Sequence, residues 1–266
     1  MILPESELPH NRDGRFYHID CGPGDLARYV LTCGDPARAM KVATHFDTVD
    51  LQRGKREFVT FTGLYKGIRA SVMGTGIGPG PTAIAMVEAC QCVSDVTFIR
   101  LGTCGAIQEE VAPGDLVITE RAIRDETTTN YYAAPDVEAS AHPDVLEALT
   151  EAAKRLSHPF HRGVTCTTSD FYAGQARCVP GFPCLDPDKI DRLRASGVLN
   201  FDMEMSVYLT LARVSEFNIR AGGMCVVAAN RISGEFASPE TVERFELRCI
   251  ETGLLALELI HATMCP

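Results

Sequence analysis

Short apolar segments that alternate with helical patterns and glycine-rich turns constrain the fold of this chain most strongly. Val96-Thr-Phe-Ile-Arg-Leu-Gly102 is nearly continuous in apolar side chains, and Arg28-Tyr-Val-Leu-Thr-Cys33 and residues 221–228 have a similar character. Strands of this kind are usually buried on both faces, in sheets that helices cover. The pattern therefore predicts an α/β fold with a central mixed or partly parallel sheet flanked by helices.

The remaining elements follow from the same periodicities. Asp35 before Pro36 is typical of a helix cap and first helical position. Strands are expected at residues 28–33, 56–65, 68–75, 96–102, 115–119, 163–168, 198–201 and 221–228, and helices at 36–46, 81–93, 143–156, 203–214 and 238–262. Residues 102–105 are expected to form a tight loop, and residues 1–15 an irregular arm. We expect one domain over residues 1–266, because no composition break divides the chain.

Composition narrows the class of partner. The 266 residues carry a net charge of −10, which argues against nucleic acid because such a partner usually needs a basic face. The N-terminus lacks the apolar run of a signal peptide, and no window is apolar enough to cross a membrane. We expect a cytoplasmic protein whose 11 cysteines are reduced thiols without metal-type spacing, although Cys178 and Cys184 bracket a loop and could pair.

Three glycine-rich loops follow predicted strands, where ligands gather in α/β sheets. The first, at Gly34, opens a helix that carries Arg38, and helix N-termini attract anions. The third follows Arg100 and contains the hydroxyl of Thr103. Arginine binds phosphate in a bidentate manner, so this loop is interpreted as an anion site, with a salt bridge at the sheet end as the alternative reading of Arg100. No loop has the spacing of a dinucleotide fingerprint or a P-loop.

Six motifs occur in the order found in the nucleoside phosphorylase-I superfamily, between about residues 16 and 263. They are Gly34-Asp-Pro-Ala-Arg38, Lys55-Arg-Glu-Phe58, Thr75-Gly-Ile-Gly78, Arg100-Leu-Gly-Thr103, Ser169-Asp-Phe-Tyr-Ala-Gly-Gln-Ala-Arg177 and Asn200-Phe-Asp-Met-Glu204. The chain resembles the uridine phosphorylases of that superfamily most.

The resemblance implies roles for individual residues. Phosphate would be held by Gly34, Arg38, Arg56, Arg100 and Thr103, with Arg56 supplied by a neighbouring subunit. The ribose would be held by Glu204 and Met203, and by His18, which resembles a partner-subunit histidine that reaches the 5′-hydroxyl. The family's fold and activity would follow, with at least a homodimer and active sites shared between subunits.

The pyrimidine is expected to lie against Phe171, Gln175 and Arg177. Uracil presents an acceptor–donor–acceptor edge, and a glutamine amide with an arginine can match it. Arg231 stands where the resemblance places an arginine in uridine phosphorylases and an aspartate in purine enzymes. It would support the base site or cap the sheet.

The implied reaction is phosphorolysis of uridine to uracil and ribose 1-phosphate in pyrimidine nucleoside salvage. Arg100, Glu204, Gln175 and Arg177 would be the catalytic residues, with inorganic phosphate as co-substrate and no metal or cofactor. Arg100 is expected to serve activity and not folding. A purine nucleoside phosphorylase of the same fold, a nucleosidase that uses water, and a non-catalytic nucleoside-binding homologue are the alternatives.

Three positions depart from the family's pattern. Ile77-Gly-Pro-Gly-Pro81 lacks the serine that helps to hold a monovalent cation in some relatives, so that site is not carried over to this chain. Cys104 stands where a threonine is frequent, and Asp202 where a glutamate is.

Overall fold

One mixed sheet of eleven strands runs through the protein, whose computed structural model describes residues 4–264. The strands lie in the order β11-β10-β6-β8-β9-β5-β1-β4-β3-β2, and β7 pairs with β6. They are β1 (Tyr29–Cys33), β2 (Thr48–Lys55), β3 (Phe58–Tyr65), β4 (Ile68–Gly74), β5 (Asp95–Ala106), β6 (Leu116–Asp125), β7 (Ala139–Ser140), β8 (Phe160–Thr168), β9 (Val198–Asp202), β10 (Asn218–Asn230) and β11 (Glu235–Phe236).

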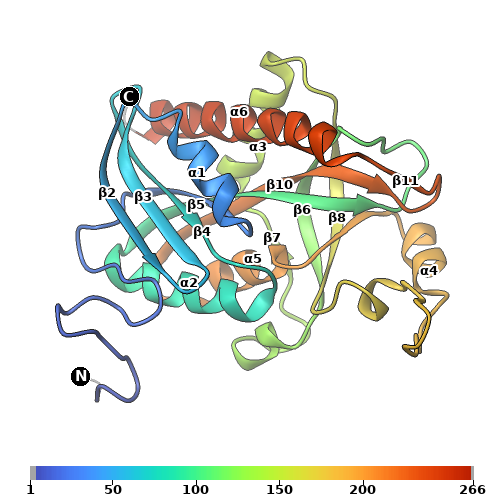
Figure 1. Ribbon diagram of the computed structural model, residues 1–266, viewed down its shortest axis with the longest axis horizontal. Coiled ribbons are helices and arrows are strands. Elements are labelled where there is room, and N and C mark those ends of the chain that lie inside the picture. Colours follow the sequence, from blue (N-terminus) through green and yellow to red (C-terminus); the bar gives the residue numbers. More distant parts are fainter. Residues whose placement is uncertain (1–3, 265–266) are drawn as a thin grey trace.

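Helices cover both faces of this sheet (Figure 1). They are α1 (Pro36–Ala43), α2 (Pro79–Cys92), α3 (Pro143–Arg155), α4 (Lys189–Ala195), α5 (Met205–Val214) and α6 (Pro239–Met264), with 3-10 turns at Thr128–Tyr131 and Ala173–Gln175. Helices α1, α3 and α6 pack into one apolar cluster on one face, and α2 and α5 pack into a second cluster on the other. The α/β fold with a mixed, helix-flanked sheet is confirmed.

The strands at the centre are parallel. β1 pairs in parallel with β4 and β5, and β10 pairs in parallel with β5. Because β10 also pairs with β6, strands β5, β9, β8, β6 and β10 close into a ring. Because β1, β4 and β5 run parallel, their carboxyl ends reach the same edge of the sheet, where the glycine-rich segments follow.

The prediction of a tight loop at residues 102–105 is wrong. β5 continues through it to Ala106, and Gly102 pairs with Cys225 of β10. A side chain at Gly102 would place its Cβ 2.5 Å from the sulfur of Cys225. Glycine is needed there because the neighbouring strand packs closely, and not because the chain turns.

The sequence analysis did not predict several of these elements. β2 is an exposed edge strand of polar residues, so it shows no apolar alternation. β7 and β11 have two residues each, and α4 has no buried residue, so they too give little apolar signal. The predicted cap is confirmed, since the carboxylate of Asp35 accepts from the amide of Ala37.

The N-terminal arm is irregular, as predicted, over residues 4–15; residues 1–3 lie outside the described range. Among the described residues, its β pairing is limited to an isolated bridge between His10 and Phe16. Phe16 and Ile19 then anchor the chain in the apolar cluster beside α2. None of the helices in residues 4–264 combines the length and apolar character that a membrane crossing requires.

Candidate active site

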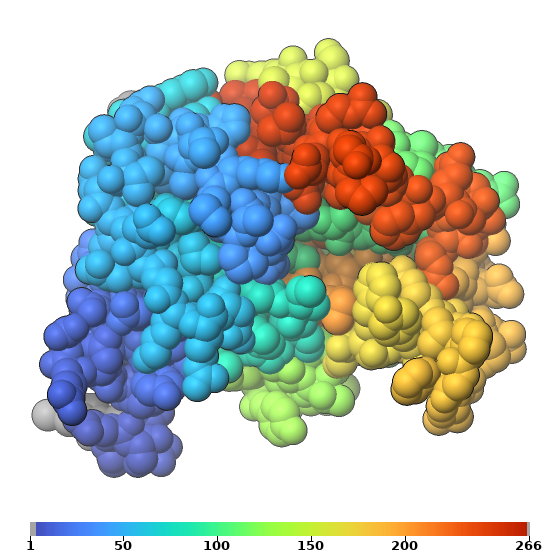
Figure 2. Space-filling view, viewed as in Figure 1, coloured from blue at the N-terminus to red at the C-terminus, as the bar shows by residue number. Residues whose placement is uncertain are grey.

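A cavity of about 710 Å³ opens where the strands' carboxyl ends meet. In the space-filling view it lies in the hollow between α1, the start of α6 and the segment near residues 170–185 (Figure 2). Nine of the predicted site residues line it: Gly34, Arg38, Arg100, Thr103, Phe171, Gln175, Arg177, Met203 and Glu204. Segments that are far apart in sequence thus contribute to one site.

At one end of the cavity, the turn after β1 brings Gly34 and Arg38 beside Thr103 of β5. The Arg38 guanidinium donates to the Thr103 hydroxyl at 2.5 Å and to the carbonyl of Leu101 at 3.1 Å. Its Nε is buried and has no partner among the described residues. Arg38 is only 6% exposed, so this free donor is fixed in place. A guanidinium beside a hydroxyl is a combination that can bind a small anion.

Glu246 of α6, which the sequence analysis did not single out, holds Arg38 from behind. Its carboxylate lies 2.7 Å from Nη2 of Arg38 and 3.1 Å from Nζ of Lys41. Burial would raise the pKa of Glu246, but the two cations lower it on balance. Glu246 lies on the buried stripe of α6 that Cys249, Ile250 and Gly253 continue. A single acidic residue in such an apolar stripe is the sequence signal that could have identified it as a site residue.

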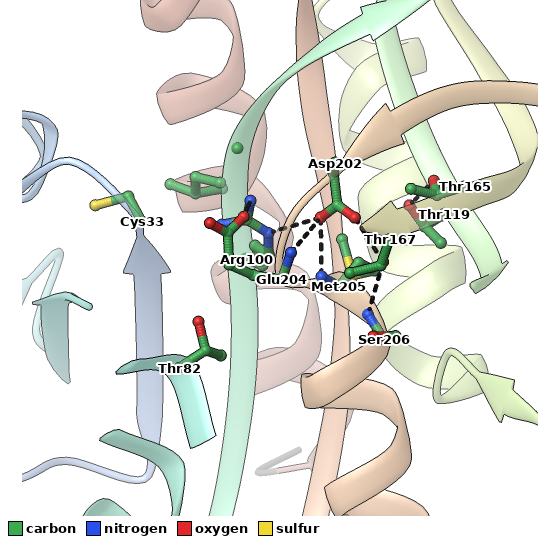
Figure 3. Close-up of polar contacts among 12 residues, drawn as sticks. Cys33, Thr82, Arg100, Thr119, Thr165, Thr167, Asp202, Glu204, Met205 and Ser206 are labelled. Carbon is green, nitrogen blue, oxygen red and sulfur yellow. Dashed lines mark hydrogen bonds and ion pairs between the residues drawn. The ribbon is translucent and has the colours of Figure 1, made fainter. Parts of the chain in front are cut away.

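Arg100 lies at the centre of a buried acidic cluster (Figure 3). Its Nη2 contacts Glu204, and its Nε is 3.3 Å from a carboxylate oxygen of Asp202. Burial would lower the pKa of Arg100, but these carboxylates raise it on balance. The third nitrogen, Nη1, is buried and has no hydrogen-bond partner within the described part of the chain.

Asp202 fixes this arrangement. Its carboxylate accepts from the backbone amide of Met205 at 2.8 Å and from the hydroxyl of Thr167 at 2.6 Å, besides contacting Arg100 (Figure 3). It therefore also satisfies the N-terminus of α5. Glu204 accepts from the amide of Gly78 at 2.7 Å, which links the second glycine loop to the site.

The geometry corrects the expectation that Arg100 serves activity alone. Its side chain is 3% exposed, and those of Asp202 and Glu204 are 0% and 6% exposed. Removing the cation would leave two buried carboxylates without their counter-ion, which is strongly destabilising. Arg100 is therefore part of the folded core as well as of the cavity.

The other end of the cavity is formed by the segment after β8. Arg177 donates to the side-chain oxygen of Gln175 at 2.5 Å and to the carbonyl of Phe171 at 2.6 Å, and its guanidinium lies 3.8 Å from the centre of the Phe171 ring. Gln175 donates to the Thr168 hydroxyl at 3.1 Å. The amide and the cation expected to recognise a base are adjacent, and each keeps further hydrogen-bonding capacity.

Arg231 lies outside the cavity lining and contacts this segment from behind. It donates to the carbonyl of Gln175 at 3.0 Å and of Ala176 at 3.4 Å. Ala176 has a left-handed backbone with φ of 53°, so the turn needs such support. Burial, together with the charge of Arg231, lowers the pKa of Arg177 to about 10.

Arg56 and His18 do not line the cavity of their own chain. Both lie near Tyr17: the His18 ring centre is 5.0 Å and the Arg56 guanidinium 5.9 Å from the Tyr17 ring centre. Arg56 is exposed, and His18 is half-buried. The two predicted partner-subunit residues therefore share one surface region, apart from the nine that meet in the cavity.

Other features bear on the earlier expectations. Phe236 of β11 lines the cavity while 72% exposed, and no sequence pattern marked it. Cys178 and Cys184 are both free thiols, and Cys104 is buried at the cavity wall. Among residues 4–264, no group of three or more His, Cys, Asp or Glu side chains is placed to hold a metal ion.

Comparison with known proteins places this geometry in a family. The sequence model of the Phosphorylase superfamily matches residues 28–260. The chain belongs to this superfamily. It is 43% identical over 235 residues to a uridine phosphorylase from Thermococcus kodakarensis, covering 87% of this chain and 83% of the relative. It is 35% identical over 228 residues to a purine nucleoside phosphorylase from Hahella chejuensis, covering 84% and 90%.

The fold agrees with that of a solved superfamily protein. The crystal structure of a Trypanosoma brucei nucleoside phosphorylase, which shows uridine phosphorylase activity, matches with a TM-score of 0.85 at 25% identity. The match covers 94% of this chain and 99% of the other. The sheet that positions the cavity is thus the sheet of a phosphorylase.

Proposed function

We propose that this member of the phosphorylase superfamily catalyses phosphorolysis of uridine to uracil and ribose 1-phosphate. The observation that carries the proposal is that one cavity is lined both by Arg38, Arg100 and Thr103, which are suited to bind an anion, and by the amide–cation pair of Gln175 and Arg177. The 43% identity to a uridine phosphorylase over most of both chains supports the same assignment.

In the proposed reaction, phosphate attacks the anomeric carbon while the base departs. The guanidinium groups of Arg38 and Arg100, which line the cavity, would bind and orient the phosphate. Positioning a weak nucleophile in this way can lower a barrier by roughly 7 kcal/mol or more. Glu204 would hold the ribose hydroxyls beside Met203, close to the phosphate because Glu204 already contacts Arg100.

At the base end, Gln175 and Arg177 would stabilise the negative charge that grows on uracil. Fixed donors aimed at developing charge are the commonest large contribution to catalysis. Phe171 would provide an apolar wall for the pyrimidine or sugar. Arg231 would act through the loop it supports, by holding the carbonyls of Gln175 and Ala176. No metal or organic cofactor has a role in this scheme.

The active unit would be at least a homodimer. Arg56 and His18 lie outside their own chain's cavity, which suits residues that complete a neighbour's site. Arg56 would add a third arginine to the phosphate, and His18 would reach the ribose 5′-hydroxyl. We place the enzyme in the cytoplasm, in pyrimidine nucleoside salvage.

The test is base release from uridine, thymidine, inosine and adenosine, with and without phosphate. Uridine turnover that requires phosphate is expected. Turnover without phosphate would indicate a nucleosidase, and tight uridine binding without turnover would indicate a non-catalytic homologue. Preference for inosine would favour a purine enzyme, the alternative that the 35% identity to a purine nucleoside phosphorylase keeps open.

A further inference from the structure

A buried glutamate outside the cavity contacts the histidine that is expected to reach the sugar. Glu88 lies in α2, an otherwise largely apolar helix, and is 5% exposed. Its carboxylate lies 2.6 Å from Nδ1 of His18, and it accepts from the backbone amides of His18 at 3.0 Å and Ile19 at 2.9 Å. The cost of burying a charge is thus offset by three N–H donors from one turn.

The turn that carries His18 is held on both sides. Phe16 and Ile19 flank the histidine and are buried against α2 together with Ala85 and Ala89. The backbone of the turn is therefore anchored by packing, and the direction of the His18 ring is set by its contact with Glu88.

This contact also fixes which ring nitrogen carries the proton. Backbone amides can only donate, so the carboxylate must accept from both of them, and an ionised carboxylate then accepts from Nδ1–H as well. In a neutral imidazole, Nε2 is left as the acceptor. Within residues 4–264, no hydrogen bond to Nε2 of His18 is formed, and the side chain is 28% exposed.

We propose that Glu88 is a positioning residue for substrate recognition. It holds His18 in the Nδ1–H form, with Nε2 presented as an acceptor for the 5′-hydroxyl of a nucleoside. This inference rests on the proposed function and adds a residue that touches no substrate itself. Through His18, Glu88 sets the preference for a nucleoside that carries a free 5′-hydroxyl over one that lacks it.

The experiment compares uridine with 5′-deoxyuridine, in wild-type protein and in Glu88→Gln, His18→Ala and the double variant. The glutamine amide is nearly isosteric and can accept from the backbone amides, but it cannot accept from all three donors as the carboxylate does. We expect wild-type protein to favour uridine in kcat/KM by about tenfold, the effect of one well-placed hydrogen bond. Glu88→Gln should remove most of that preference and leave turnover of 5′-deoxyuridine nearly unchanged.

The double variant and a matched control separate positioning from general damage. If Glu88 acts through His18, the double variant loses no more than His18→Ala, because coupled residues are non-additive. Glu258→Gln is the control, since Glu258 also accepts from two side chains, Tyr65 and Lys66, but lies on α6 at the surface. It should keep the full uridine preference.

The outcomes are distinguishable from failure of the proposed function. Wild-type protein that does not phosphorolyse uridine refutes the proposed function. Active wild-type protein whose Glu88→Gln variant loses equal activity on both nucleosides, or none on either, refutes the role of Glu88. A nitrogen-15 NMR spectrum of wild-type histidine side chains is an independent measurement that needs no folded Glu88 variant. A neutral His18 protonated on Nε2 would overturn the proposal.

Discussion

The two ends of the cavity hold their arginines in opposite ways. At the proposed phosphate end, Arg38 and Arg100 are buried, and carboxylates contact both. At the proposed base end, Arg177 and Arg231 contact carbonyl and amide oxygens, and neither forms an ion pair with another described residue. The pKa of Arg100 is raised and that of Arg177 is lowered accordingly.

The difference follows from the elements that carry the residues. Arg100 lies within β5, whose neighbours on both sides fix its backbone, so a charge there must be compensated inside the core. Arg177 follows a short 3-10 turn in a connecting segment. Its side chain is half-buried there, so water solvates part of its charge. The proposed phosphate end is thus built into the strands of the core, whereas the proposed base end lies in a connecting segment outside those strands. Replacing arginines by methionine at both ends tests this contrast.

The largest effect is expected for Arg100→Met. It leaves Asp202 and Glu204 buried without their counter-ion, so the free energy of unfolding should fall by about 3 kcal/mol or more. Phosphorolysis should fall by at least about 100-fold, because a donor to the attacking phosphate is lost. Urea denaturation and steady-state kinetics measure the two effects.

A double variant separates the two roles of Arg100. Adding Asp202→Asn to Arg100→Met removes one unpaired charge and should recover part of the lost stability. It should recover no activity. An Arg100→Met protein as stable as wild type would contradict the view that Arg100 is needed to neutralise Asp202 and Glu204 in the core.

An intermediate effect is expected for Arg177→Met. Its contacts are to Phe171 and Gln175 and not to acids, so the free energy of unfolding should change by less than about 1 kcal/mol. Uridine kcat/KM should fall about 10- to 100-fold, as expected when a charged hydrogen bond is lost. The KM for phosphate should stay near wild type. A loss of stability as large as that of Arg100→Met would remove the contrast between the two ends.

The sequence placed Gly34, Arg38, Arg100 and Thr103 together because they lie in or directly after apolar strands. Gly34 and Arg38 come after an apolar strand and a capped helix start, and Arg100 and Thr103 lie in another apolar strand. Periodicity therefore brought them to one edge of the sheet. It could not supply Glu246, which reaches Arg38 from a helix more than 200 positions later in the chain.

The base end depended on the family resemblance. Phe171, Gln175 and Arg177 lie in a segment without apolar periodicity, which alone would be interpreted as a surface loop. Their meeting with Arg231 depends on the closed ring of strands, in which β10 pairs with both β5 and β6. A ring closure of this kind leaves no local signal in sequence, and neither does the exposed Phe236 at the cavity.

The smallest effect is expected for Arg231→Met. Arg231 holds the carbonyls of Gln175 and Ala176, so its loss should loosen the base-binding segment without removing a substrate contact. The KM for uridine should rise about three- to tenfold, in keeping with one or two weak hydrogen bonds, while the KM for phosphate is unchanged.

Arg248→Met provides the matched control for this last variant, because Arg248 also donates to a backbone carbonyl, that of Gly114, away from the cavity lining. Its uridine KM should equal that of wild type. If Arg231 touched the base directly, its loss would lower uridine kcat/KM about as strongly as Arg177→Met does. A rise in uridine KM with kcat kept would instead assign Arg231 to the support of the loop, since only the arrangement of Gln175 would have changed.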